Sequence, residues 1–299
     1  MFVSNKKAVN GGHHPDLKKP PTECAPGIGT NVCSPEIGIK KMREFLEYIR
    51  PEIAPKVKSM SREEVVNTLK DTLKVDAESG ILNNSEFRRF GNAKLADKIL
   101  NLYFNPKKPG TLLDNFNIDE KLEQWARSSE KLYGKKFYHV PFQMIDFEQQ
   151  KDHLATLYIP DIIKNYDCLG VVFNTDVSTG RGIHWFSVFL DFAHKGTADD
   201  PYQLEFFNSS GNPPQAEPYN NVYNWLEHTA HVILKDTGKK SKVIIASQEQ
   251  IQHSKTECGM WALIYILSRL EGRPPNWLYK IGANDSDMIK LREHLFRKY

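Results

Sequence analysis

The sequence predicts an α+β protein in which a catalytic domain follows a smaller helical domain. Three observations support this prediction. Short apolar runs bounded by turn residues indicate buried strands in the second two-thirds of the chain. Segments with helical periodicity lie between and before these runs. A break rich in proline and glycine separates the helices at the start from the rest, so strands and helices share one core only beyond that break.

The N-terminal third divides into an arm and a helical domain. Residues 1–36 are rich in Gly, Pro, Asn and Lys and show no sustained period, so we expect a flexible arm. Residues 37–109 contain three helical patterns: the apolar positions Met42, Phe45, Leu46 and Ile49; a capping box at Ser61 and Glu64 before Val65, Leu69 and Leu73; and the apolar positions Leu95, Ile99 and Leu102.

The segment at residues 105–110, Asn-Pro-Lys-Lys-Pro-Gly, cannot continue a helix and marks the domain boundary. The second domain, residues 110–299, contains alternating helices and strands. We expect helices over 118–132, 219–234, 260–270 and 286–297, and strands over 169–174, 185–192, 203–207 and 242–246.

Composition sets limits on the class of function. Lys and Arg number 40 against 37 Asp and Glu, so the charge does not point to nucleic acid as the main partner, although a weak basic patch stays open. The longest apolar stretches, 186–192 and 261–267, are far shorter than the roughly 20 residues of a membrane span. No apolar segment follows the charged residues 1–7, so we expect no secretory signal and a reducing, intracellular setting.

Four cysteines are too few for a scaffold built on disulfides in a chain of this length. Cys24 and Cys33 are spaced more widely than a zinc knuckle, so we interpret them as loop thiols, with a zinc site as the less favoured alternative. Cys168 begins an apolar run and is expected to be a small buried hydrophobe. We predict neither a metal nor a cofactor.

Cys258 has the setting of a nucleophile. It precedes an apolar helical pattern, so its sulfur is expected at a helix N-terminus, where the helix dipole favours the thiolate and lowers the pKa of the thiol. Gly259 beside it is expected to let the backbone approach a substrate closely. By itself this pattern also fits a core cysteine at the start of a buried helix.

Three further polar residues complete a catalytic pattern. His184 opens one predicted strand and Asn208 ends the next, so adjacent strands can bring imidazole and carboxamide together. The carboxamide oxygen would then orient the ring as a base for the thiol. Gln252 lies six residues before Cys258, and its amide is a candidate oxyanion donor beside the Cys258 backbone N–H.

Other residues compete for two of these roles. Asp176 and Asp191 are acidic alternatives to Asn208 as the partner of the histidine. Gln248 and Gln250 offer rival amides to Gln252. The sequence alone leaves these alternatives open.

The pattern resembles the clan of ubiquitin-like-protein proteases, which includes SUMO-specific proteases and the adenovirus protease. The resemblance rests on His184-Trp185, Asn208, Gln252 and Cys258-Gly259 in that order. Further stretches are similar to the polyprotein-processing branch found in African swine fever virus and related large DNA viruses: residues 113–120, 174–176, 205–209, 256–259 and 294–297. Asn208 matches this viral branch, whereas the SUMO proteases have Asp at that position.

The resemblance implies a papain-like, SUMO-protease-like catalytic domain with a central mixed sheet flanked by helices. It implies a cysteine endopeptidase that cleaves after Gly-Gly and matures viral structural polyproteins, at assembly sites in the host cytoplasm and in the virion. Trp185, Asn174 and Trp261 are expected to border the substrate channel. Removal of ubiquitin-like modifiers, acyl transfer and a non-catalytic binding module are the alternatives. The oligomeric state is left open.

Overall fold

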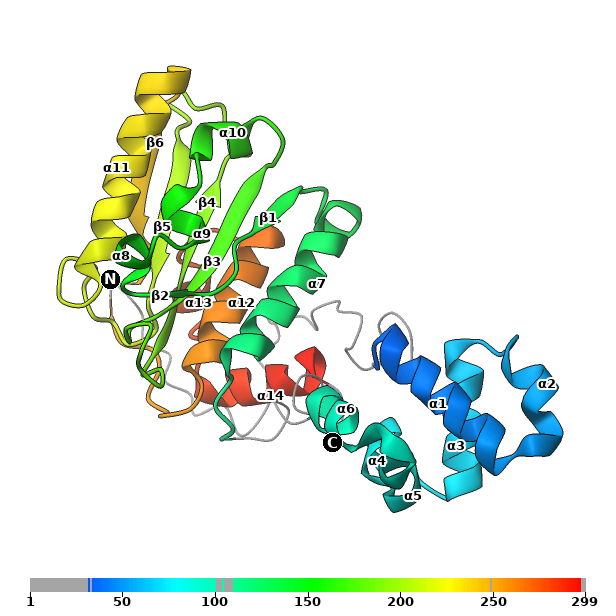
Figure 1. Cartoon of the computed structure of the whole chain (residues 1–299). Helices are drawn as coiled ribbons and strands as arrows, with labels where there is room; N and C mark the ends of the chain where they lie inside the picture. Colours follow the sequence, from blue (N-terminus) through cyan, green and yellow to red (C-terminus); the bar gives the residue numbers. More distant parts are fainter. Residues whose placement is uncertain (1–31, 33, 101–103, 105–109, 248, 297–299) are drawn as a thin grey trace.

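The computed structural model describes residues 32, 34–100, 104, 110–247 and 249–296 (Figure 1). The helices before residue 100 form a group of their own beside a sheet covered by helices on both faces. Residues 105–109 of the predicted domain boundary lie outside the described residues, as do Cys24, Cys33 and Gln248. None of the helices in the described part of the chain has the length and apolar character that crossing a bilayer requires.

The first group consists of short helices around one apolar cluster. Its elements are α1 (Glu36–Ile49), a 3-10 turn (Pro51–Ile53), α2 (Ala54–Val57), α3 (Arg62–Leu73), α4 (Glu78–Asn83), α5 (Ser85–Phe87), a π-type turn (Arg88–Asn92) and α6 (Ala93–Ile99). The predicted capping box begins α3: Ser61 Oγ accepts the Glu64 N–H at 3.2 Å, and the Glu64 carboxylate accepts the Ser61 N–H at 2.6 Å. The predicted apolar positions Met42, Phe45 and Leu46 are buried.

The end of the predicted arm belongs to this helical group. Val32 and Ser34 are both buried. The Ser34 backbone N–H donates to the carboxylate of Glu78 at 2.8 Å, and its carbonyl accepts from the Arg62 guanidinium at 2.5 Å. The rest of the arm lies outside the described residues.

The second part is built on a six-stranded mixed sheet, which confirms the predicted α+β class. The strand order is β1 (Phe137–His139), β3 (Cys168–Asn174), β4 (Trp185–Asp191), β5 (Tyr202–Phe207) and β6 (Ser241–Ile245), and β2 (Gln143–Met144) also pairs with β3. The central pairs, β3 with β4 and β4 with β5, are antiparallel, while the outer pairs are parallel. The strands β1 and β2 were not predicted, because two or three residues carry no measurable period.

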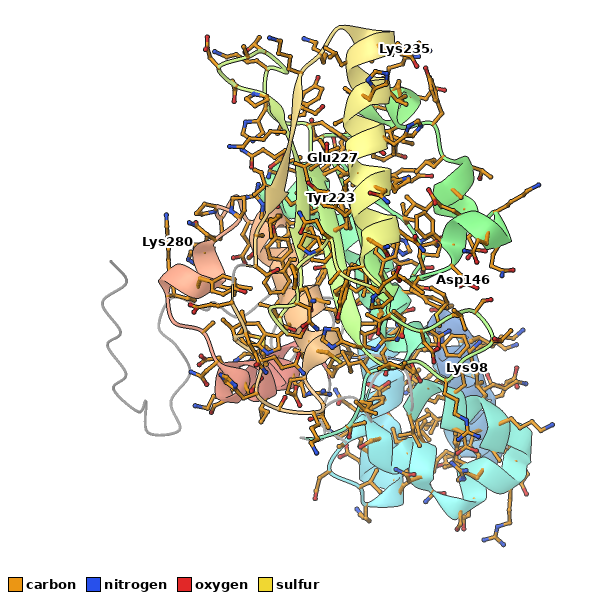
Figure 2. All side chains as sticks on the ribbon, turned by 90° about the vertical axis from the view of Figure 1, so that its left-hand side faces the viewer. Lys98, Asp146, Tyr223, Glu227, Lys235 and Lys280 are labelled. Carbon is orange, nitrogen blue, oxygen red and sulfur yellow. The ribbon has the colours of Figure 1, made fainter. Side chains whose placement is uncertain are left out.

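Helices cover both faces of the sheet (Figure 1). On one face lie α7 (Asn115–Tyr133), α12 (Cys258–Leu270), α13 (Trp277–Lys280) and α14 (Asp285–Leu295). On the other lie α8 (Phe147–Gln150), α9 (His153–Thr156), α10 (Ile159–Ile163) and α11 (Asn220–Thr237). In Figure 2, Tyr223, Glu227 and Lys235 mark the length of α11 as it runs along the sheet. Each face therefore has its own apolar layer.

The helix α12 is the centre of one of these layers. All 13 of its residues are buried, and it packs on β4, α7 and α14. The alternation along β4 directs Trp185 and Phe189 toward α12, whereas Phe186, Val188 and Leu190 face the α11 layer. This packing brings the first residue of α12 to the edge of the sheet where β4 begins.

A buried ionic cluster fixes the other end of α12 to the sheet. Arg269 donates to Glu205 at 2.8 Å and to Asp191 at 3.0 Å, and Tyr265 donates to Glu205 at 2.6 Å. Lys135, two residues after the end of α7, lies with its ammonium 3.6 Å from the Asp191 carboxylate. The two carboxylates come from β4 and β5, and Arg269 and Tyr265 come from α12. The cluster therefore fixes the position of the helix along the sheet.

We expect Arg269→Met to lower the free energy of unfolding by about 3–5 kcal/mol, because it leaves two buried carboxylates without their guanidinium partner. The matched control is Lys164→Met, which removes an ion pair with Asp161 whose side chains are 69% and 62% exposed. The control is expected to change stability by less than about 1 kcal/mol. Urea unfolding followed by tryptophan fluorescence measures both. A loss for Arg269→Met as small as that of the control would contradict the role of the cluster.

Candidate active site

Cys258 is the first residue of α12, as predicted. Its side chain is 4% exposed at the wall of a cleft of about 350 Å³. The backbone N–H of Trp185 lies near the sulfur and favours its thiolate form. Because Trp185 directly follows His184, this contact places the thiol beside the start of β4.

The pKa of Cys258 departs from the expected direction. Burial raises the pKa of this thiol above its ordinary value, and the backbone N–H groups of Trp185, Gly259 and Cys258 oppose the rise without reversing it. The sequence predicted a lowered pKa from the helix N-terminus. The prediction of direction was wrong, because the same packing that places the sulfur at the helix end also removes the water that would solvate a thiolate.

His184 and Asn208 meet as predicted. His184 Nε2 lies 2.8 Å from Asn208 Oδ1. The register of β4 and β5, with Ser187 opposite Phe207, brings the start of one strand to the end of the other. Asn208 is fully buried and its backbone N–H donates to Ser247 Oγ at 2.9 Å. The carboxamide therefore has a fixed position at the strand end.

The surroundings of Asn208 determine which imidazole nitrogen carries the proton. Asn208 Oδ1 also accepts the backbone N–H of Ser210 at 3.1 Å and its hydroxyl at 2.9 Å. Since this oxygen only accepts, His184 Nε2 must be the donor. Nδ1 is then the unprotonated nitrogen of the neutral ring and can take a proton from a thiol. Burial lowers the pKa of His184 and the Asn208 bond opposes that shift, so a neutral ring is favoured.

The two acidic alternatives to Asn208 have other partners. Asp191 lies at the far end of β4, about 20 Å along the strand from Trp185. It belongs to the ionic cluster with Arg269. Asp176 accepts the backbone N–H groups of Val177 and Gly182 within its own loop.

Gln252 is held with its amide oxygen turned away from solvent. Its Oε1 accepts the Ser209 hydroxyl at 2.7 Å, and its Nε2 donates to the Ser254 carbonyl at 2.8 Å. One N–H of the amide remains for another acceptor. The rival Gln250 donates its side chain to the Gln252 carbonyl at 2.8 Å. Ser209 was not predicted as a site residue, although it directly follows Asn208.

The turn before Cys258 is anchored by α14, which sequence reasoning did not connect with the site. Asp285 accepts the backbone N–H groups of His253 and Ser254, each at 2.7 Å. Glu257 forms a fully buried ion pair with Arg292 at 2.7 Å. The available signals were the acidic residue next to Cys258 and the arginine in the last predicted helix, but nothing in the sequence pairs them.

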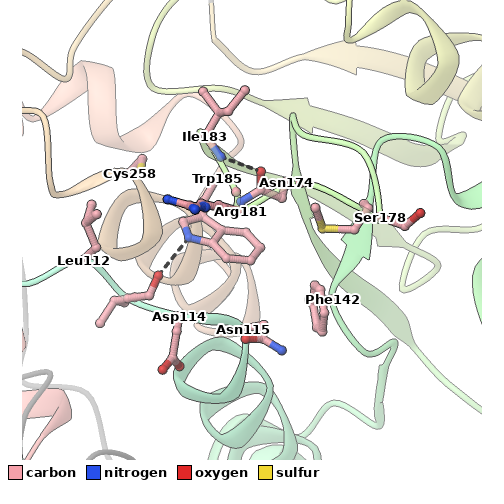
Figure 3. A pocket seen from close by; sticks show the side chains of 14 residues that line it. Leu112, Asp114, Asn115, Phe142, Asn174, Ser178, Arg181, Ile183, Trp185 and Cys258 are labelled. Atoms are coloured by element: carbon pink, nitrogen blue, oxygen red, sulfur yellow. Dashed lines mark hydrogen bonds between the residues drawn. The ribbon is translucent and has the colours of Figure 1, made fainter.

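The cleft beside Cys258 runs between the start of α7 and the loop that joins β3 to β4 (Figure 3). Its lining includes Trp185 and Asn174, two of the three residues expected at the channel. The Trp185 indole N–H donates to the Leu113 carbonyl at 2.9 Å, and its ring packs edge-on against Phe142. These contacts hold the indole as a fixed wall.

Trp261 and Gly259 have different surroundings from those expected. Trp261 is fully buried and its indole N–H donates to Asp285 at 2.9 Å, so the structure places it in the core instead of the channel wall. A Cβ on Gly259 would lie 3.0 Å from the Cβ of Leu113. The absence of a side chain at Gly259 therefore allows Leu113 to pack closely against α12. The sequence had suggested that it allows a substrate to approach. Cys168 is buried, as predicted, and burial raises the pKa of its thiol.

No family model matches the chain. The chain is 33% identical over 247 residues to the SUMO-1 cysteine protease of a South African tick isolate of African swine fever virus, covering 76% of this chain and 85% of that protein. The cysteine protease of the Badajoz strain gives the same identity and coverage.

The crystal structure of the African swine fever virus protease superposes with a TM-score of 0.64 at 26% identity. The match covers 95% of this chain and 98% of that one. It therefore includes the helical N-terminal part as well as the sheet. The chain belongs to the family of SUMO-1 cysteine proteases that includes the African swine fever virus enzyme, and it is a cysteine peptidase.

Proposed function

We propose that this chain is an endopeptidase that cleaves after Gly-Gly elements and matures viral structural polyproteins during particle assembly. Its place of action is then the assembly site in the host cytoplasm and the virion. The observation that carries the proposal is the His184 to Asn208 bond, which leaves Nδ1 unprotonated beside the strand start that contacts the Cys258 sulfur. Relationship to viral cysteine proteases supports the setting.

In the proposed reaction, Nδ1 of His184 takes the thiol proton as the Cys258 sulfur attacks the carbonyl carbon of the scissile bond. The Cys258 backbone N–H and the remaining N–H of Gln252 stabilise the oxyanion. The imidazolium then protonates the leaving amine, and a thioester remains on the sulfur. Water, deprotonated by His184, attacks the thioester, the acid product leaves, and the imidazolium returns its proton to the departing sulfur. Asn208 orients the ring throughout.

The walls of the cleft support a preference for glycine. The Trp185 indole is fixed by Leu113 and Phe142, so it cannot turn aside for a bulky side chain next to the scissile bond. Residues without side chains can pass between these walls. The acyltransferase and binding-module alternatives are set aside because the chain is a cysteine peptidase.

One experiment separates the two remaining substrates. The purified chain is incubated with unfolded polypeptides containing internal Gly-Gly and, separately, with a folded ubiquitin-like modifier joined through a C-terminal Gly-Gly to a reporter. Efficient cleavage of the first and poor cleavage of the second is expected. The reverse order would favour deconjugation, and cleavage of neither would contradict the proposed specificity.

We expect Cys258→Ala to abolish cleavage while the protein stays folded, because the nucleophile is lost and little volume changes. His184→Ala should lower kcat/KM by about 10²–10⁴-fold, the usual contribution of a positioned acid and base. Asn208→Ala should cost less, because the base remains although its orientation is lost. Peptide kinetics together with circular dichroism measure these effects, and turnover by folded Cys258→Ala would refute the assignment.

The burial of the Cys258 thiol predicts that its thiolate forms only at high pH. Since loss of water disfavours the thiolate, Cys258 should show no thiolate absorbance near 240 nm at pH 7, and the signal should appear above the usual value of about 8.5. The difference between the wild type and Cys258→Ala isolates this thiol from the other three. Thiolate absorbance at pH 5–6 would mean a preformed ion pair instead.

A neutral resting pair also predicts the effect of Asn208→Asp. With a neutral thiol and a neutral ring, the rising limb of the pH profile of kcat/KM follows the imidazole, whose pKa burial lowers. A carboxylate at position 208 would favour the imidazolium, so it should move the rising limb to higher pH. Profiles with one Gly-Gly peptide test this, with Asn208→Ala as the control. An unchanged limb would argue against contact between the two side chains during catalysis.

A further inference from the structure

The loop between β3 and β4 brings a cation to the cleft. Gly180, Arg181, Gly182 and Ile183 all line the same cleft as Cys258. In Figure 3, the Arg181 side chain lies between Cys258, Trp185 and Asn174. Arg181 is an exposed residue on a loop, yet it extends along the cleft wall instead of away from it.

This loop is held in one conformation by its own hydrogen bonds. Asn174 Oδ1 accepts the backbone N–H groups of Asp176 at 3.0 Å and Ile183 at 2.9 Å. The carboxylate of Asp176 accepts the Gly182 N–H at 3.0 Å. Gly182 has a φ of +89°, which favours glycine. Arg181 is therefore presented by a backbone that is ordered before any substrate arrives.

A second set of hydrogen bonds joins this loop to Asp146, the residue before α8. Asp146 accepts the Ser178 backbone N–H at 2.9 Å and the Ser178 hydroxyl at 2.8 Å. Burial raises the pKa of Asp146, but the hydrogen bonds donated by Ser178 and Gln150 outweigh it, so the pKa lies below its ordinary value. The loop is thus fixed at its start, middle and end.

The guanidinium of Arg181 has no ion-pair partner within the described ranges. Its neighbour Asp176 is engaged by loop N–H groups. Asp114, on the opposite wall, accepts the Asn117 N–H at 2.8 Å and caps α7. The cleft therefore offers a cation whose hydrogen-bond donors remain available to an incoming anion. The cleft wall also carries the apolar side chains of Leu112 and Ile183. These residues are 61% and 74% exposed, so a substrate can contact them.

The lining supports an assignment of this cleft to one side of the scissile bond. It includes Cys258 and Trp185 but not His184, within the described part of the chain. In the proposed reaction His184 protonates the leaving amine, so the leaving segment lies on the histidine side. The cleft with Arg181 then receives the acyl segment, upstream of the glycine pair.

We propose that Arg181 is a specificity residue that binds an acidic side chain just upstream of the Gly-Gly element, and that Leu112 and Ile183 contact an apolar neighbour of that acid. The inference rests on the proposed Gly-Gly cleavage. An extended chain advances about 3.3 Å per residue, and Arg181 lines the same cleft as Cys258, so we place the acid one to three residues before the glycines. Guanidinium and carboxylate match in shape and form a pair of charge-assisted hydrogen bonds.

The test uses peptides that differ at one position. Each contains Gly-Gly and a fluorogenic leaving group, with Glu, Gln or Lys placed one, two or three residues before the glycines. For the wild type, the best Glu peptide should exceed its Gln partner by up to about fivefold in kcat/KM, the size of a partly solvated ion pair, with less preference at high salt. Arg181→Gln should remove this preference, so that the variant cleaves the Glu and Gln peptides with equal kcat/KM.

Charge reversal and a matched control sharpen the result. Arg181→Glu should prefer the Lys peptide over the Glu peptide. Lys164→Gln removes another exposed positive charge, at the C-terminal end of α10, and should keep the wild-type preference. A wild type that cleaves Glu and Gln peptides equally at all three positions would overturn the inference, as would a preference that survives Arg181→Gln.

A binding measurement keeps this inference separate from the proposed function. Fluorescence anisotropy with Cys258→Ala measures the affinity for the same peptides without turnover. Tighter binding of the Glu peptide, lost in the double variant with Arg181→Gln, supports the acidic subsite even if the cleavage site proves not to be Gly-Gly. Equal affinity for Glu and Gln peptides would overturn the subsite, while Gly-Gly cleavage by the wild type would still stand.

Discussion

The burial of α12 is the constraint on which the rest of the structure depends. A helix whose 13 residues are all buried must have packing partners on every side, and β4, α7 and α14 supply them. Its direction is fixed by the ionic cluster of Arg269 with the sheet at one end. The other end then falls beside the start of β4. The meeting of Cys258 with the His184 strand is a consequence of core packing.

A buried helix start leaves backbone groups and charges that need partners, and α14 provides them. Asp285 accepts two N–H groups of the turn that leads to Cys258, and Arg292 neutralises Glu257. Unpaired, that carboxylate would be costly so far from water. The last helix of the chain is thus part of the support of the nucleophile, although it contributes no residue to the proposed reaction.

The same burial determines the protonation of the pair. Loss of water disfavours both the thiolate and the imidazolium, so it raises the pKa of Cys258 and lowers that of His184. The two shifts together favour a neutral resting pair. A neutral Asn208 suits this state, because it orients the ring without stabilising its charged form. Under the proposed mechanism, proton transfer accompanies attack on the substrate and does not precede it.

The sequence by itself determined the parts that depend on local patterns. Period and turn residues predicted strands over 169–174 and 185–192, close to the observed β3 and β4, and placed Cys258 at a helix N-terminus. Strand order made Asn208 a candidate partner of His184, beside two acidic alternatives. Only the tertiary structure decided which residues are buried by segments that lie far away in the sequence. It buried Trp261 against Asp285, set Leu113 against Gly259 and directed Arg181 into the cleft. Burial and its effect on pKa depend on the whole packed chain, so no local pattern encodes them.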